Sequence, residues 1–156
     1  MREINVEIEG VTPLLMHSPK AMLENAMYGG KAKLKTTKKG VTYDPKEEAK
    51  KAAYEMKTGE LYIPSEAIYG CIIRAASFYK IQKRSAPQIL AGAIRIDPIE
   101  VGLGTNKYEI DLRTVVIQRQ RIVRARPRLD KWKAKFKIIY NDKIIDAEDM
   151  FRHSKW

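Results

Sequence analysis

The sequence predicts an α+β fold in which an antiparallel sheet packs against helices. Segments near both ends alternate apolar and polar residues with a period of two, the pattern of a strand with one buried face, while central segments repeat apolar residues at helical spacing. The chain has 156 residues, of which 44% are hydrophobic. This length and composition suit a single domain, residues 1–156, with an apolar core.

A strand is expected at the start, where residues 3–9 alternate isoleucine or valine with polar side chains up to Gly10. The next residues, 11–30, contain prolines that interrupt regular structure, and Ser18 favours the start of a short helix. Residues 30–43 are rich in lysine and poor in large apolar side chains. They predict an inserted, exposed basic loop.

Two further helices are expected in the middle of the chain. Asp44 is followed by a proline and then by a glutamate placed for a capping box, so a helix should run over residues 47–56. Residues 60–64 predict a short strand that ends at a proline, and Ser65 can cap a helix that extends to about residue 79. The side chains expected on its buried face are Ile68, Cys71, Ile72 and Ala75.

The single cysteine, Cys71, cannot form an internal disulfide, and we expect it to be a small buried hydrophobe. A reducing, intracellular environment follows from this use of cysteine. The N-terminus begins directly with an alternating strand, so no secretory signal is expected. The predicted location is the cytoplasm.

Strands are expected to fill the second half. Residues 93–101 predict a strand interrupted by Pro98, and residues 108–120 predict another after a glycine turn. A break is expected at Pro127, because proline cannot donate to a strand ladder. A last strand should follow, in which lysines on one face alternate with Trp132 and other apolar residues on the buried face.

Positive charge is concentrated in residues 113–137, which hold ten Lys or Arg and a single acid, Asp130. The whole chain has a net charge of +11, and residues 101–156, with 14 basic and 7 acidic side chains, contribute +7 of it. Such a patch attracts nucleic acid and gives salt-dependent affinity through counterion release. No amphipathic basic helix or apolar span accompanies the charge, so a membrane partner is not expected.

Two rows of cations lie within this region. The lysine ladder consists of Lys131, Lys133, Lys135 and Lys137. Its ammonium groups would lie about 6.6 Å apart, twice the strand rise, as a track for a nucleic-acid strand. The arginine row consists of Arg124, Arg126 and Arg128, and is preceded by Arg119 and Arg121.

Five guanidinium groups this close repel one another unless anions or acids intervene, and only Asp130 offers local compensation. Phosphate binding is therefore the favoured interpretation, while a solvated strand face or pairing with the N-terminal glutamates is the alternative. The basic loop is expected to form a second site for phosphate. Its candidate contacts are Lys31, Lys33, Lys35, Lys38 and Lys39.

Catalytic chemistry has weak support in the sequence. His17 is the one weak candidate, as a general base on a ribose hydroxyl beside the arginines. No paired carboxylates, metal-ligand spacing, phosphate loop or nucleophile elbow occurs, so neither a cofactor nor a metal is expected.

Three passages resemble the RAMP superfamily of CRISPR RNA-binding proteins, particularly backbone-type subunits and their relatives in phages and mobile elements. They are VEIEGVTPLLMHSP, GELYIPSEAIYGCIIRAA and RIVRARPRLDKWKAKFKI. The resemblance implies a modified ferredoxin-like or RRM-like fold that binds RNA or other single-stranded nucleic acid. It also implies a homo-oligomer, often head-to-tail, or a place among ribonucleoprotein subunits.

The expected function is therefore non-enzymatic binding of single-stranded RNA or DNA, with RNA preferred, through the phosphate backbone. Two alternatives remain open. One is a metal-independent endoribonuclease in which His17 works beside the arginines. The other is a viral or mobile-element regulatory protein whose basic strand binds an acidic protein surface.

Overall fold

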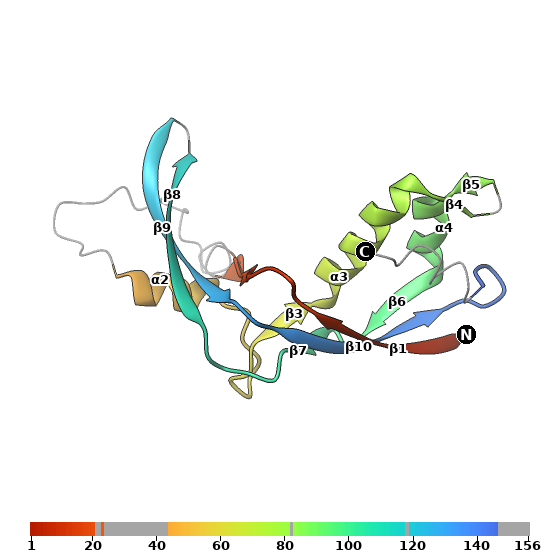
Figure 1. Cartoon of the computed structure of the whole chain (residues 1–156), viewed down its shortest axis with the longest axis horizontal. Coiled ribbons are helices and arrows are strands. Elements are labelled where there is room, and N and C mark those ends of the chain that lie inside the picture. The colour runs from red at the N-terminus through yellow and green to blue at the C-terminus, as the bar shows by residue number, and fades with distance from the viewer. Residues whose placement is uncertain (21–22, 24–43, 82, 118, 147–156) are drawn as a thin grey trace. The chain divides into compact units, whose positions relative to one another are not determined.

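The computed structural model describes residues 1–20, 23, 44–81, 83–117 and 119–146 (Figure 1). Within these residues the chain is α+β, as predicted, and it has antiparallel sheets and three α-helices. The chain divides into two compact units. Unit 1 contains Met1–Glu9, Tyr62–Gly104 and the described residues from Lys133 onward, and unit 2 contains the described part of Gly10–Leu61 together with Thr105–Trp132.

The main sheet of unit 1 has the strand order β1-β10-β6, and its neighbouring strands are antiparallel. Its strands are β1 (Arg2–Glu9), β10 (Lys133–Tyr140) and β6 (Ile94–Asp97). The alternation predicted for the last strand is confirmed, because Ala134, Phe136 and Ile138 are buried and the lysines between them are exposed. Lys131 and Trp132 precede β10, so only the other three lysines of the ladder belong to the strand.

The strand predicted over residues 93–101 is divided at Pro98, where the sequence predicted an interruption. β6 ends at Asp97, the Asp97–Pro98 peptide bond is cis, and β7 (Glu100–Gly102) begins a separate two-stranded sheet. Its partner is β3 (Tyr62–Pro64), the short strand expected before the central helix.

The helical part of unit 1 follows β3. It consists of α3 (Ser65–Ala75), the 3-10 helix η1 (Ala76–Phe78), the small hairpin β4 (Lys80–Ile81) with β5 (Arg84–Ser85), and α4 (Ala86–Ala93). Pro64 rather than Ser65 is the N-cap of α3, so the expected serine cap is absent. α3 contacts both β6 and α4 (Figure 1), and Tyr69 Oη donates a hydrogen bond to Ala91 O at 2.9 Å.

Cys71 is exposed on α3, and the prediction that it is buried was wrong. The buried stripe of the helix contains Ser65 and Ile68, and Ile72 is half-buried next to them. Cys71 lies instead with exposed Ala67 and Arg74, which are four residues before it and three after it. An apolar run therefore did not define which face of the helix is covered.

Unit 2 is built on a long β-hairpin (Figure 1). Its elements are β8 (Glu109–Ile117), β9 (Gln120–Leu129), the short strand β2 (Leu14–Leu15) and α2 (Pro45–Ala52). The sheet order is β2-β9-β8, and β2 pairs only with the last two residues of β9. α2 contacts β9, and its Ala49 and Ala52 side chains are buried.

The start of α2 confirms the expected N-cap, because Asp44 Oδ1 accepts a hydrogen bond from Lys46 N at 2.9 Å. Glu47 forms an ion pair with Lys51 one turn later. The helix ends at Ala52, earlier than predicted. Most of the short helix expected after Ser18, and the whole of the basic loop over residues 30–43, lie outside the described residues.

β9 continues through Pro127, so the expected break there was wrong. Pro127 O accepts a hydrogen bond from Met16 N at 3.0 Å, on the edge of β9 that faces away from β8. The N and C=O groups of one strand residue point to the same side, so the missing N–H of Pro127 also lies on that edge. The ladder between β8 and β9 needs no donor from it.

The turn at Gly10 accommodates an indole ring. A Cβ atom at Gly10 would lie 2.0 Å from Trp132 Nε1, which itself donates a hydrogen bond to Thr12 O at 3.0 Å. Trp132 is therefore held by the loop that follows β1. None of the described helices is long and apolar enough to cross a membrane.

Candidate functional site

The arginine row lies on one face of β9, as its spacing predicted. Because directly opposed residues in antiparallel strands share a face, the register also places β8 side chains on that face. The cross-strand pairs are Glu109 with Arg128, Asp111 with Arg126, and Arg113 with Arg124. Two carboxylates thus face the arginines, in addition to the one that the local sequence offered.

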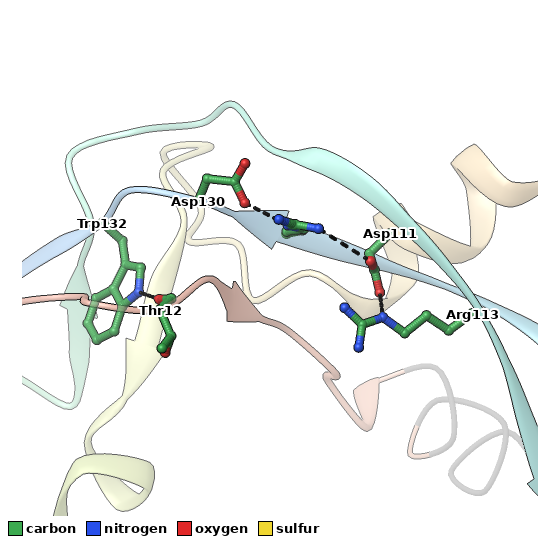
Figure 2. A network of polar contacts seen from close by, with 6 residues as sticks. Thr12, Asp111, Arg113, Asp130 and Trp132 are labelled. Atoms are coloured by element: carbon green, nitrogen blue, oxygen red, sulfur yellow. Dashed lines mark hydrogen bonds and ion pairs between the residues drawn. The ribbon is translucent and has the colours of Figure 1, made fainter.

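Asp111 is the centre of this charge network (Figure 2). Its Oδ2 lies 2.6 Å from Arg113 Nε and its Oδ1 lies 3.8 Å from Arg128 Nη1, while its side chain is only 11% exposed. Arg128 Nε also donates a hydrogen bond to Asp130 Oδ1 at 2.6 Å, and this bond raises the pKa of Arg128 above its ordinary value. The expectation that only Asp130 compensates the charge of the arginines was therefore incomplete, because Asp111 also pairs with Arg113 and Arg128.

Arg124 is held by a carboxylate from α2. Glu48 Oε1 accepts from Arg124 Nη1 at 2.8 Å, and Glu48 Oε2 accepts from the backbone N of Ala125 at 3.0 Å. The Glu48 side chain is 23% exposed and that of Arg124 is 35% exposed. One carboxylate thus neutralises an arginine and satisfies a backbone donor of β9, which fixes α2 against the hairpin.

Arg126 and His17 are two further groups near this row. Arg126 forms no ion pair among the described residues, and its Nε is buried without a hydrogen-bond partner there. Partial burial, the charge of Arg126 and the charge of Arg124, in that order, lower the pKa of His17, and Glu48 opposes the shift. His17 is therefore neutral near pH 7, beside two arginines.

The end of the hairpin that lies farthest from β2 carries two exposed arginines. Arg121 is exposed, and Arg119 is exposed in the left-handed region at φ 67°. Within the described part of the chain neither residue forms an ion pair. A non-glycine residue with this φ is strained, so the turn holds an arginine where glycine would be favoured.

Apolar side chains are exposed on the hairpin face opposite the arginine row. They are Ile110 (37% exposed), Leu112 (55%), Val116 (66%) and Val123 (46%). The register pairs Val116 directly with Arg121, so cation and apolar side chain are neighbours on one face. Toward β2 the same face is buried at Ala125, Pro127 and Leu129. The distal half of the hairpin, residues 114–117 and 119–123, thus exposes Val116 and Val123 beside Arg119 and Arg121, which form no ion pair within the described residues.

The lysine ladder is paired with glutamates of β1. Lys133 Nζ lies 3.2 Å from Glu9 Oε2, Lys135 Nζ 3.3 Å from Glu7 Oε2, and Lys137 Nζ 3.0 Å from Glu3 Oε2. Pairing of these glutamates with the arginines was the alternative that the sequence left open, but the β1-β10 register directs them to the lysines. Their complementary alternation was the available sequence signal. Lys131, ahead of the strand, forms no ion pair with any described residue.

The predicted contacts consequently divide into three groups. The lysine ladder from Lys133 onward belongs to unit 1, whereas the arginines belong to unit 2, and in each group some cations are already paired with acids. The basic loop contacts, Lys31, Lys33, Lys35, Lys38 and Lys39, lie outside the described residues. Among the residues that are described, no cluster of three or more His, Cys, Asp or Glu side chains could hold a metal ion.

Comparisons with protein-family models, curated proteins and solved structures found no match to this chain. The resemblance to the RAMP superfamily therefore stays a prediction from the three sequence passages that suggested it.

Proposed function

We propose that the chain binds single-stranded nucleic acid without cleaving it, and that the distal half of the β8-β9 hairpin is the main contact. The observation that carries this proposal is the pair of exposed arginines, Arg119 and Arg121, beside exposed Val116 and Val123. Unpaired guanidinium groups bind phosphate, and apolar side chains next to them contact bases that a single strand leaves unstacked.

Ion pairing decides which cations contribute most. A lysine that is paired with glutamate must exchange one anion for another when phosphate arrives, so its net gain is small. Arg119 and Arg121 have no such competitor among the described residues, and phosphate neutralises them directly. The ladder lysines Lys133 and Lys135 are therefore assigned a minor role.

The experiment is a fluorescence-anisotropy titration with matched single-stranded RNA, single-stranded DNA and duplex probes at two salt concentrations. The variant Arg119→Gln/Arg121→Gln should bind the single strands at least tenfold more weakly than the wild type. Lys133→Gln/Lys135→Gln removes the same two charges from paired positions and is the matched control, with an expected change under threefold. Equal losses in the two variants would overturn the assignment to the hairpin.

The preference for RNA, the modified ferredoxin-like topology and assembly with further copies or ribonucleoprotein subunits are also part of the proposal, and they rest on the resemblance to the RAMP superfamily. An antiparallel sheet and two helices within unit 1 are compatible with that topology. Tighter binding of the RNA probe than of the matched DNA probe would support the preference. Equal binding would remove it.

A metal-independent endoribonuclease is the second candidate, favoured by the neutral His17 beside Arg124 and Arg126. In that reaction His17 would accept a proton from a ribose 2′-hydroxyl while the arginines hold the phosphate. Incubation of labelled RNA with the protein in chelator decides between the two functions. Cleavage that is lost in His17→Ala would replace the binding proposal with the enzymatic one.

A further inference from the structure

The end of α3 and the small β4-β5 hairpin carry a second exposed combination of aromatic and basic side chains, in unit 1. Phe78 is 88% exposed, although it lies in a well-anchored segment. Its neighbours Ala76 and Ile81 are 6% and 3% exposed. The ring is therefore presented to solvent by a packed element.

Backbone hydrogen bonds hold this segment in place. Tyr79 N donates to Ala76 O at 3.0 Å, and Ala86 N donates to Tyr79 O at 3.2 Å, which joins η1 to the start of α4. Ser77 Oγ also donates to Arg74 O. The backbone that carries the ring is held in this way, so it loses little conformational freedom when a planar ligand stacks on Phe78.

Basic residues lie on both sides of Phe78 in the sequence. Between Glu66 and Asp97 the chain contains five basic residues and no acid. Four of them belong to this corner of unit 1: Arg74, Lys80, Lys83 and Arg84. All four are exposed, and the described residues supply no ion pair to any of them. This distinguishes them from the ladder lysines, which face glutamates.

The β4-β5 hairpin begins directly after η1, so its first cation, Lys80, lies close to Phe78 along the chain. Lys80 pairs with Ser85 and Ile81 with Arg84, so both strands carry a cation, and these two cations lie on opposite faces of the hairpin. Only the extended residue Tyr79 separates Phe78 from Lys80, which places their Cα atoms roughly 6–7 Å apart. The connection contains Lys83 at φ 65°, a left-handed conformation like that of Arg119 in the other hairpin. Two hairpin turns thus hold a cation where glycine would relieve strain.

We propose that this cluster is a second contact for single-stranded nucleic acid, in which Phe78 stacks on a base and Lys80 and Lys83 bind neighbouring phosphates. The inference rests on the proposed function, because it adds a contact in unit 1 to the hairpin contact of unit 2. An exposed aromatic ring among cations favours a single strand over an acidic protein surface, since unstacked bases supply π-faces beside each phosphate.

The test uses the full chain and the single-stranded RNA probe. Phe78→Ala should weaken binding by at least fivefold, the lower range for loss of one stacked base, and leave the salt dependence unchanged because no charge is removed. Phe78→Trp should retain the affinity. Lys80→Gln/Lys83→Gly should weaken binding and flatten the salt dependence, while glycine suits the conformation at residue 83. Ile99→Ala, at a site that is 70% exposed in the same unit, is the control and should have no effect.

The outcomes separate this inference from the proposed function. If Arg119→Gln/Arg121→Gln weakens binding but Phe78→Ala binds as the wild type does, the second contact is overturned and the hairpin site stands. If the wild type binds no nucleic acid, the proposed function falls and the inference falls with it. If Phe78→Ala weakens binding of polyglutamate as much as binding of RNA, the cluster is a general docking surface for acidic polymers and its assignment to bases is overturned.

Discussion

Removal of the Glu48 carboxylate should loosen α2 from the hairpin. Glu48 accepts one hydrogen bond from Arg124 and one from the Ala125 backbone at 2.8 and 3.0 Å. Hydrogen bonds to charged groups contribute about 1.5–3 kcal/mol each, and partial exposure of Arg124 reduces the electrostatic share. We therefore expect Glu48→Ala to lower the free energy of unfolding by about 2–3 kcal/mol, and Glu48→Gln by about 1 kcal/mol, because the amide oxygen can still accept from Ala125 N.

The assay is urea denaturation of the full chain, followed by circular dichroism and tryptophan fluorescence. Glu47→Ala is the matched control, since it removes a neighbouring carboxylate whose ion pair with Lys51 is exposed on the same helix. Its expected effect is below about 0.5 kcal/mol. The reasoning would be refuted if Glu48→Ala and Glu47→Ala changed stability equally, or if Arg124→Ala and Glu48→Ala were additive in a double-mutant cycle.

Three further predictions concern packing, pH and charge. Gly10→Ala should lower the free energy of unfolding by about 2–4 kcal/mol and shift tryptophan emission, because the added Cβ would displace the Trp132 indole. In Gly92→Ala, within α4, the added Cβ meets no atom within 4 Å, so this change should raise the free energy of unfolding by about 0.5–1 kcal/mol. Urea unfolding tests this pair, and equal effects would contradict it. Because the pKa of His17 is lowered in the folded protein, His17 is protonated in the unfolded chain at a higher pH than in the folded one. Acidification below about pH 6.5 should therefore destabilise the wild type slightly more than His17→Gln. Identical pH profiles of the melting temperature would refute this. Glu7→Gln/Glu9→Gln should free Lys135 and Lys133 from their ion pairs and lower the free energy of unfolding by a few tenths of a kcal/mol per pair. It should also strengthen RNA binding in low salt. Unchanged binding would argue against masking of these lysines by the glutamates.

Local patterns predicted the elements whose side chains have a simple repeat. The alternation in β1 and β10 identified two strands of the main sheet, and Asp44 identified the start of α2. α4 escaped prediction because its short segment APQILAGA contains a proline and a glycine and has no side-chain cap. Continuation of β9 through Pro127 depended on which edge of the strand lacks a donor, and no local pattern contains that information.

The candidate site was predicted in part, since its charges are local but their partners are not. Lys135 meets Glu7 only because β10 returns beside β1, and Arg124 meets Glu48 only because α2 packs on β9. Strand register therefore determined which cations stay unpaired. The exposed ring of Phe78 was also missed, because burial of one aromatic side chain cannot be read from its neighbours.

The salt dependence of RNA binding by the matched charge variants tests the central claim most directly. For a single strand, each phosphate contact contributes about 0.7 to the slope of log Kobs against log salt. Arg119→Gln/Arg121→Gln should therefore reduce the slope by about 1.4, whereas Lys133→Gln/Lys135→Gln, with the same net charge, should leave it close to the wild-type value. A slope that falls equally in both variants, or more in the lysine variant, would contradict the claim that unpaired hairpin arginines form the phosphate contact.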